Sequence, residues 1–366
     1  MTQPVNVAEY EQLAKERMAP GAWDYIAGGA GDEITLKRNE AAFSKIPLHP
    51  RVLVDVAHTD TSTELLGARL TMPILLAPTG FQTLSHPDGE LASARAAAAQ
   101  GTVSVLSTLS AFTIEEVAAA ATGPRWFQLY CYRDRGVTQR LVERAEAAGF
   151  VALCVTVDLA RVGQRERDLR SGFQLPPEAR PRNFDGLIDD RAAASGLGFA
   201  EYIGTLVDPS LTWEIVDWLR SVTTLPIVLK GIMRADDAQR GVDAGVDGII
   251  VSNHGGRQLD TVPAPIDALL MIGMVARGRM PVLADGGIRR GTDVVKALAL
   301  GAAAVLIGRP YVWGLAVDGE AGVARVLQLL KAETELAMAL CGCPTVGDID
   351  ASLVTGLGWQ GDGRQA

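Results

Sequence analysis

Short apolar runs alternate with alanine-rich stretches along the chain from residue 72 onward. The stretches between the runs, such as 90–100 and 114–121, carry apolar residues at helical spacing. Strands that alternate with helices in this way predict βα units and a parallel sheet. Eight such units predict a closed (β/α)8 barrel, with an open doubly wound sheet as the alternative. The eight runs are Met72–Gly80, Thr102–Leu109, Arg125–Tyr132, Val151–Asp158, Leu225–Gly231, Gly248–Gly255, Pro281–Gly287 and Ala303–Pro310.

The segments outside this repeat are predicted separately. Within residues 1–71, the segment Val7–Met18 predicts a helix, and 45–55 with 63–71 predict a hairpin on the barrel floor. Near the C-terminus the apolar residues Val323, Val326, Leu327 and Leu330 recur at helical spacing, which predicts a closing amphipathic helix. We expect one domain over 1–366, with 1–71 packed on the barrel as an extension.

The connection after the fourth strand is unusually long. Residues 166–212 are polar, include Pro176-Pro177 and show no clear periodicity. Long connections in compact domains are either functional loops or plain insertions. Because this one follows a strand on the expected active face, we predict a mobile lid, with a surface insertion without a role as the alternative.

Charge and composition exclude several classes of protein. The chain has 34 Lys and Arg against 43 Asp and Glu, a net charge of −9, which disfavours nucleic acid or an anionic membrane as a partner. The first residues lack the pattern of a secretory signal, so we expect a cytoplasmic protein. The longest apolar stretch, 297–308, is too short to span a membrane. The 4 cysteines form no CxxC and the 4 histidines no HxH pair, so neither a metal site nor a disulfide framework is predicted, and a metal-dependent hydrolase is disfavoured.

The candidate chemistry lies where the strands end. The run Gly248–Val251 leads directly into Ser252–Asp260, with the sequence SNHGGRQLD. A histidine and an arginine at a strand's C-terminal end place a titratable base and a fixed cation where barrel enzymes carry their active sites. The other strands also end in polar or small residues, which would be costly to bury without a partner and indicate a polar ligand. They are Gly80, Ser107–Leu109, Gln128, Tyr130, Thr156, Asp158, Arg165 and Lys230.

The last two strands end in glycines and arginines. Asp285-Gly286-Gly287-Ile288-Arg289 and Gly308-Arg309 combine exposed main-chain N–H groups with positive charge. This combination is typical of the phosphate site of such barrels. No GxGxxG motif opens a βαβ unit, which disfavours a nicotinamide dinucleotide.

With Lys230-Gly231 before it, and with Asp285-Gly-Gly and Gly308-Arg-Pro after it, the SNHGGRQLD motif resembles the FMN-dependent L-2-hydroxy acid oxidase and dehydrogenase family. Among members of that family the chain is most similar to glycolate oxidase and lactate oxidase. The resemblance runs from about Val5 to about Gly347. It implies an FMN-binding (β/α)8 enzyme that oxidises (S)-2-hydroxy acids to 2-oxo acids and passes the electrons to O2, giving H2O2. It also implies a homo-oligomer, a tetramer or an octamer.

The resemblance assigns a role to each candidate residue. His254 is the implied base, held by Asp158, and Arg257 and Arg165 clamp the substrate carboxylate. Tyr25 and Tyr130 complete the substrate site, with Gly80 and Leu109 beside them. The implied cofactor residues are Thr79, Gly80, Ser107, Gln128, Thr156, Lys230, Ser252, Asp285, Gly287, Arg289, Gly308 and Arg309, of which Lys230 faces the N1/C2 oxygen edge of the flavin. No metal is implied.

Two positions depart from the glycolate oxidase pattern. Gly80 stands where that enzyme has alanine, and Leu109 stands where it has a pocket tryptophan. Both changes remove volume, so we predict lactate and longer or aromatic 2-hydroxy acids over glycolate. Three alternatives stay open: a dehydrogenase with a quinone or protein acceptor, a decarboxylating monooxygenase-like outcome, and a binding protein that lost catalysis.

Overall fold

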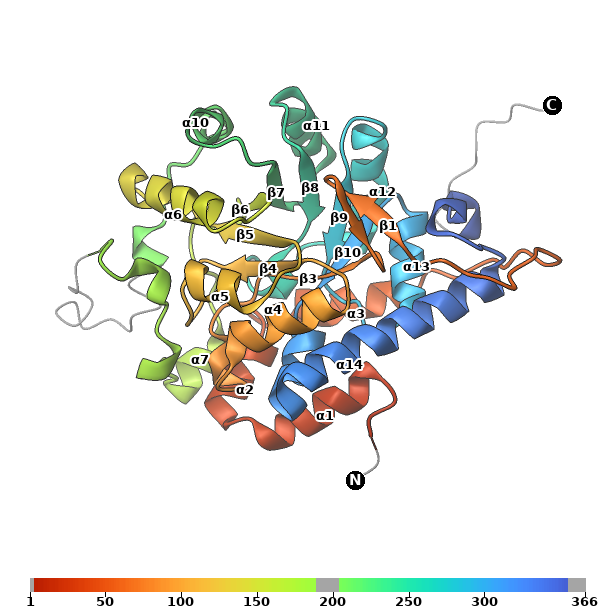
Figure 1. The fold of residues 1–366 in the computed structure, drawn as a ribbon, viewed down its shortest axis with the longest axis horizontal. Helices are drawn as coiled ribbons and strands as arrows, with labels where there is room; N and C mark the ends of the chain where they lie inside the picture. The colour runs from red at the N-terminus through yellow and green to blue at the C-terminus, as the bar shows by residue number, and fades with distance from the viewer. Residues whose placement is uncertain (1–2, 189–203, 355–366) are drawn as a thin grey trace.

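A computed structural model describes residues 3–188 and 204–354. Eight parallel strands close into a barrel in the order β10-β3-β4-β5-β6-β7-β8-β9 (Figure 1). Seven of the eight predicted apolar runs contain one of these strands, and β7 extends one residue beyond the run Leu225–Gly231. The prediction of a closed (β/α)8 barrel is therefore confirmed, and the alternative of an open sheet is wrong. The barrel strands are β3 (Ile74–Leu76), β4 (Ser104–Ser107), β5 (Arg125–Leu129), β6 (Ala152–Thr156), β7 (Ile227–Ile232), β8 (Gly248–Val251), β9 (Val282–Asp285) and β10 (Ala304–Ile307).

Alternate residues of each strand face opposite sides of the barrel wall. Leu75, Val105, Trp126, Val228 and Ile250 belong to an apolar cluster of inward-facing side chains. The residues between them pack outward against the helices in a second, larger cluster. The strands are therefore buried on both faces, which explains why they read as continuous apolar runs in the sequence.

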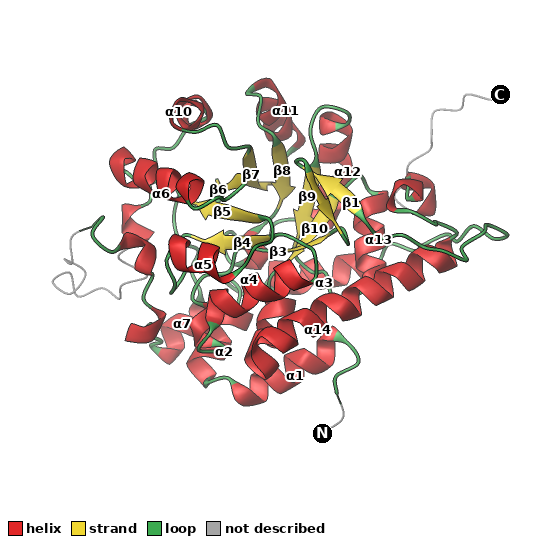
Figure 2. Ribbon diagram, in the orientation of Figure 1, coloured by secondary structure: helices red, strands yellow, loops and turns green. Residues whose placement is uncertain are grey.

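Helices surround the barrel, as Figure 2 shows. The N-terminal segment forms three helices, of which only the first was predicted. The closing helix α14 is kinked at Asp318 and Gly319, and the predicted apolar stripe from Val323 to Leu330 is buried in it. Helices α1, α4 and α14 pack together along one side of the barrel (Figure 1). The helices are α1 (Val7–Arg17), α2 (Pro20–Ala27), α3 (Ile34–Ser44), α4 (Gly89–Ala99), α5 (Ile114–Ala120), α6 (Arg135–Ala147), α7 (Glu166–Ser171), α10 (Glu214–Val222), α11 (Ala235–Asp243), α12 (Pro265–Ala276), α13 (Gly291–Ala299) and α14 (Arg309–Cys341).

The floor hairpin is shorter than predicted. Its strands β1 (Thr63–Leu65) and β2 (Ala68–Leu70) both lie within 63–71, joined by a two-residue turn. Leu65 and Leu70 are buried against the inward-facing cluster, so the hairpin does close the barrel floor. Placing its other strand at 45–55 was wrong. That segment contains two prolines, which cannot donate ladder hydrogen bonds, and it forms only an isolated bridge from Leu48 to Val354.

The predicted lid, 166–212, is described only at 166–188 and 204–212; the rest lies outside the described residues. Its first part forms α7 and two short 3₁₀ turns, η2 (Pro177–Ala179) and η3 (Arg182–Phe184). Asn183 is fully buried there, accepts from the Ile114 main-chain N–H and donates to the Thr108 carbonyl. These contacts anchor the first part to the loop after β4. Whether the segment acts as a lid stays a prediction.

None of the described helices combines the length and the apolar character needed to cross a membrane. The cysteines Cys131, Cys154, Cys341 and Cys343 are all buried free thiols.

Candidate active site

The inward-facing positions of the strands change from apolar to polar toward the C-terminal ends. Two residues beyond Val105, Trp126, Cys154, Val228 and Leu283, which belong to the inward-facing cluster, the chain carries polar side chains. These are Ser107, Gln128, Thr156, Lys230 and Asp285. Because the side-chain period of a strand is two, the same register that packs the core also places these polar groups in one ring.

The ring opens into a cavity of about 1040 Å³, including the space at its mouth. Cofactor and ligand sites typically measure about 300–1,000 Å³. Every predicted site residue lines this cavity except Asp158 and Ser252. Ser252 is fully buried behind Lys230, and its hydroxyl accepts from Lys230 Nζ at 3.0 Å and from the His254 main-chain N–H at 3.1 Å. Asp158 reaches the cavity only through His254.

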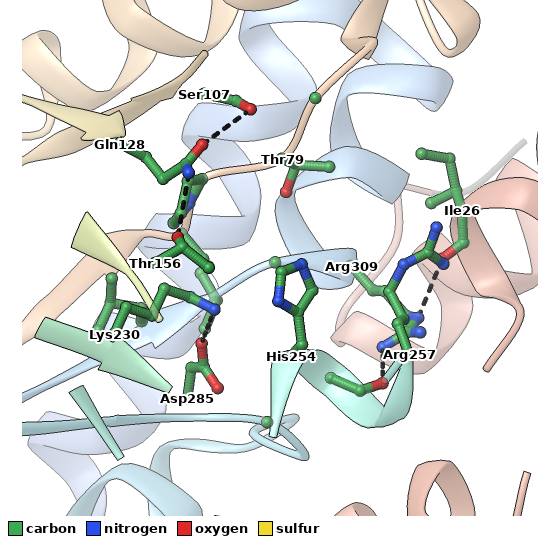
Figure 3. A pocket seen from close by; sticks show the side chains of 18 of the residues that line it. Ile26, Thr79, Ser107, Gln128, Thr156, Lys230, His254, Arg257, Asp285 and Arg309 are labelled. Atoms are coloured by element: carbon green, nitrogen blue, oxygen red, sulfur yellow. Dashed lines mark hydrogen bonds and ion pairs between the residues drawn. The ribbon is translucent and has the colours of Figure 1, made fainter. Parts of the chain in front are cut away.

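One side of the cavity is a connected row of polar side chains, visible in Figure 3. Ser107 Oγ donates to Gln128 Oε1 at 3.2 Å, and Gln128 Nε2 donates to Thr156 Oγ1 at 3.0 Å. Next to this row, Lys230 Nζ lies 3.4 Å from Asp285 Oδ2. Burial alone would lower the pKa of Lys230, but Asp285 and Asp158 outweigh burial and raise it. Lys230 is therefore a permanent buried cation.

His254 stands between this row and the arginines on the opposite side (Figure 3). Its Nδ1 lies 2.9 Å from Asp158 Oδ1. Burial lowers the pKa of His254, and with the nearby cation Lys230 it outweighs the opposing effect of Asp158. For Asp158, burial acts to raise the pKa, but His254 and Lys230 outweigh it and lower it. The pair is thus a neutral imidazole beside a carboxylate at neutral pH, which is the arrangement of a general base ready to accept a proton.

The backbone at His254 is strained. Its φ is 58°, and Gly255 and Gly256 follow at 63° and 74°. A left-handed conformation costs a residue other than glycine roughly 1–2 kcal/mol. Strain of this kind is concentrated at functional sites. The two glycines of the motif allow the chain to turn sharply and aim the imidazole into the cavity.

The opposite side of the cavity carries an excess of positive charge. Arg257 Nη1 donates to the carbonyls of Tyr25 (2.6 Å) and Gly28 (2.9 Å). Arg309 donates to the carbonyls of Ile26, Gly28 and Gly255 at 2.8–3.0 Å. Burial, together with nearby arginines, lowers the pKa of Arg257 to about 10 and that of Arg309 to about 9.

No carboxylate among the described residues forms an ion pair with Arg165, Arg257 or Arg309. The ring centroid of Tyr25 lies 5.0 Å from Arg257 Cζ and 5.6 Å from Arg165 Cζ. Cations that are crowded and partly buried without an ion-paired carboxylate favour an anionic ligand, and guanidinium matches a carboxylate or phosphate in two-point contact.

Two further residues of the motif, Asn253 and Asp260, hold helix α3. Asn253 exchanges side-chain hydrogen bonds with Asn39 of α3 at 2.8 and 2.9 Å. Asp260 accepts from the first N–H groups of α3, at Ile34 and Thr35. Burial acts to raise the pKa of Asp260, but these main-chain donors lower it to about 2. One motif therefore supplies the base and the cation and also fixes α3 against the barrel mouth.

Sequence reasoning missed site residues that come from outside the βα repeat. Asp168 of α7 interacts electrostatically with Arg257 and Arg165, and burial raises its pKa. Ile26 of α2 lines the cavity. No local signal marks either residue, because both reach the site through tertiary packing of the extension and of segment 166–188.

The cavity fits a flavin mononucleotide. The Ser107–Gln128–Thr156 row offers donors and acceptors to a flat polar ring system, and Asp285 Oδ1 is buried with no partner among the described residues. A Cβ at Gly308 would meet its nearest neighbours beyond the adjacent residues, Ala77 Cβ and Thr79 Oγ1, only at 3.9 Å, so the wall is not crowded at this glycine. Arg289 Nε is likewise buried without a partner. These residues would hold the ring, the ribityl chain and the phosphate. No cluster of metal-ligating side chains occurs among the described residues.

Comparison with known proteins agrees with this geometry. The model of the FMN-dependent dehydrogenase family matches residues 14–356. The chain is 52% identical over 345 residues to glycolate oxidase 3 of Oryza sativa subsp. indica, which covers 94% of each chain. It is 52% identical to an L-lactate oxidase of Nostoc sp. in an alignment of 360 residues, which covers 97% of this chain and 99% of the lactate oxidase.

Among solved structures, mandelate oxidase superimposes with a TM-score of 0.89 at 43% identity, over 96% of this chain and 98% of that one. The matched region includes the whole barrel and the residues of the cavity. The chain thus belongs to the FMN-dependent 2-hydroxy acid oxidase family, and its cofactor is FMN.

Proposed function

We propose that this protein oxidises (S)-2-hydroxy acids to 2-oxo acids with O2 as the electron acceptor, giving H2O2, and that it prefers lactate and larger or aromatic substrates to glycolate. The observation that carries the proposal is the placement of His254, held by Asp158, between the Ser107–Gln128–Thr156 row and arginines that form no ion pair among the described residues. This arrangement provides a base beside a site for a carboxylate.

Each protein group has a distinct part in the reaction. Arg257 and Arg165 bind the substrate carboxylate and orient the carbon that carries the hydroxyl. His254 accepts one of the protons that the substrate loses, and Asp158 stabilises the imidazolium. Burial raises the pKa of Tyr130, so its hydroxyl stays protonated and can donate to a substrate oxygen. FMN, when bound, would supply the two-electron acceptor for this oxidation.

The substrate preference rests on two neighbouring residues. Gly80 and Leu109 both line the cavity. A Cβ at Gly80 would lie only 2.9 Å from Leu109 Cβ, so the leucine is packed directly against the glycine. A leucine fills less of the cavity than the tryptophan of the glycolate oxidase pattern. A larger substrate side chain can therefore bury apolar area there, at about 25 cal/mol per Å². The relatives include glycolate, L-lactate and mandelate oxidases by name, so they do not decide the substrate.

The experiment is anaerobic flavin reduction with glycolate, lactate, mandelate and 2-hydroxyoctanoate, followed by admission of air. We expect bleaching of the flavin by all four, with the lowest kcat/KM for glycolate. Leu109→Trp should lower kcat/KM for mandelate at least tenfold relative to glycolate. Glycolate as the best substrate of the unmodified protein would contradict the preference. Failure of every 2-hydroxy acid to bleach the flavin would contradict the function and favour a binding protein.

Admission of air separates the possible acceptors. One H2O2 per substrate oxidised is expected for the oxidase. Slow reoxidation by O2 but fast reoxidation by a quinone would favour the dehydrogenase, and loss of CO2 would indicate the decarboxylating outcome. The tetrameric or octameric assembly and the cytoplasmic location stay predictions. Light scattering would test the first and cell fractionation the second.

The activity should depend on pH through His254. Because only the neutral imidazole accepts a proton, kcat/KM should fall as the pH decreases through a pKa below 6.5. Asp158 acts to raise that pKa, so Asp158→Asn should move the acid limb to lower pH. The same variant should reduce the maximal kcat/KM by about 10²-fold, because the imidazolium loses its counter-charge. An acid limb that stays in place in Asp158→Asn would contradict this assignment.

A further inference from the structure

A buried carboxylate lies outside the cavity, beneath two of the loops that form it. Glu90, in the first turn of α4, is 2% exposed. Its Oε1 accepts from the Gln82 main-chain N–H at 3.1 Å, and its Oε2 is buried with no hydrogen-bond partner among the described residues. Burial raises the pKa of Glu90 to about 7, and the main-chain amides of Gln82 and Ala111 act against that rise. A buried carboxyl group is costly, and the catalytic steps above do not use it.

The two amides near Glu90 belong to different loops. Gln82 follows the loop after β3, which carries Gly80, and Ala111 lies in the loop after β4, which carries Leu109. Between the loops the Phe81 N–H donates to the Leu109 carbonyl at 3.0 Å. Phe81 holds a left-handed φ of 58°, so the backbone at this junction is strained. Such a conformation persists only where its surroundings determine it.

A second side chain of α4 acts on the same loop. Ser93, one helical turn beyond Glu90, donates to Gln82 Oε1 at 2.6 Å. Gln82 Nε2 in turn donates to the Thr79 carbonyl and to the Tyr311 hydroxyl, both at 3.1 Å. Helix α4 therefore fixes Gln82 at its main chain and at its side chain, and through Gln82 it fixes Thr79 and Gly80 in the cavity wall.

We propose that Glu90 is a positioning residue for substrate specificity: with Ser93 and Gln82 it forms a clamp that sets the distance between Gly80 and Leu109. This inference rests on the proposed function, in which these two residues contact the substrate side chain. The contact across the wall is already tight, because a Cβ at Gly80 would lie 2.9 Å from Leu109 Cβ and 3.1 Å from the Leu109 carbonyl. A shift of a few tenths of an ångström between the loops therefore changes the space for the substrate side chain.

Glu90→Gln is the sharpest test, because the amide keeps the size of the side chain and one acceptor oxygen but removes the charge. We expect the kcat/KM ratio of 2-hydroxyoctanoate to lactate to change at least fivefold, mainly through KM. The Kd for FMN and the rate constant of flavin reduction by saturating lactate should change less than threefold. Ser93→Ala should shift the ratio in the same direction by a smaller factor, and it keeps the test decisive if Glu90→Gln does not fold.

Glu116→Gln is the matched control. It removes a carboxylate from the first turn of the neighbouring helix α5, where Glu116 binds the Thr113 N–H and Arg182 rather than the loop after β3. Its substrate ratio should equal that of the unmodified protein. Two results would overturn the clamp but leave the proposed function intact. One is an unchanged substrate ratio in Glu90→Gln, and the other is an equal loss of kcat/KM for all substrates together with a lower Tm. An unmodified protein whose flavin no 2-hydroxy acid reduces would overturn both the proposed function and the clamp.

Discussion

Replacement of His254 by glutamine is expected to lower the rate constant of anaerobic flavin reduction about 10³-fold, within the ~10²- to 10⁴-fold that a positioned general base contributes. Glutamine can still donate and accept hydrogen bonds at this position, but it cannot take up a proton near neutral pH. The ring of His254 faces the cavity between the Ser107–Gln128–Thr156 row and the arginines (Figure 3). Asp158 Oδ1 lies 2.9 Å from His254 Nδ1, which leaves Nε2 as the atom that can accept a proton. The loss should therefore fall on the chemical step. Stopped-flow measurement of flavin bleaching with saturating lactate gives this rate constant directly.

The control for this variant is His58→Gln, because His58 is exposed in the segment before β1. It should reduce its flavin at the unmodified rate. Both variants should retain the flavin absorbance spectrum, since His254 is not among the groups that hold FMN. A His254→Gln enzyme that keeps more than a tenth of the normal rate constant would show that another group accepts the proton.

The strand ends were predictable from the sequence because one register serves both the core and the site. Val105 and Trp126 pack inside the barrel, and two residues later Ser107 and Gln128 face the cofactor space. An apolar run that ends in a polar residue of the correct parity therefore marks the wall of the cavity. Residues such as Lys230 could be placed in the site by counting along the strand. Counting along a strand does not show how deeply a side chain is buried. Ser252 was therefore expected to line the cavity, but it is buried behind Lys230.

The other features of the site depend on tertiary contacts, which produce no periodic pattern in the sequence. Asn253 and Asp260 belong to the most informative motif, yet their role is to hold α3, a helix that the sequence pattern did not reveal. From the sequence, Gly80 was expected to remove volume beside the substrate, but the structure shows Leu109 packed against this glycine. Glu90 gave no signal at all, because a glutamate at the start of a helix is usually a solvated residue that favours the helix dipole. Its burial follows only from the way α4 meets the two loops.

The second large effect is expected at the carboxylate site. Arg257→Met should lower kcat/KM for lactate about 10²- to 10³-fold, mostly through KM, because truncating one partner of a desolvated charge pair costs about 2–5 kcal/mol. Arg257→Lys should recover only part of this loss. An ammonium cannot contact a carboxylate at two points, and it cannot reproduce the fixed guanidinium that also donates to the carbonyls of Tyr25 and Gly28.

A neutral substrate distinguishes loss of charge recognition from general damage to the site. Mandelamide has the shape of mandelate but lacks the negative charge, so the unmodified protein should strongly prefer the acid. In Arg257→Met the ratio of kcat/KM for acid over amide should fall at least tenfold, whereas the exposed Arg234→Met should leave the ratio unchanged. Equal losses for acid and amide in Arg257→Met would show that Arg257 acts only through its contacts with α2. The pKa of Arg257 is lowered by burial and by Arg165, and Tyr25 and Asp168 offset this only in part. The free site therefore holds two cations that repel each other, and a carboxylate bound between them would relieve the remaining repulsion.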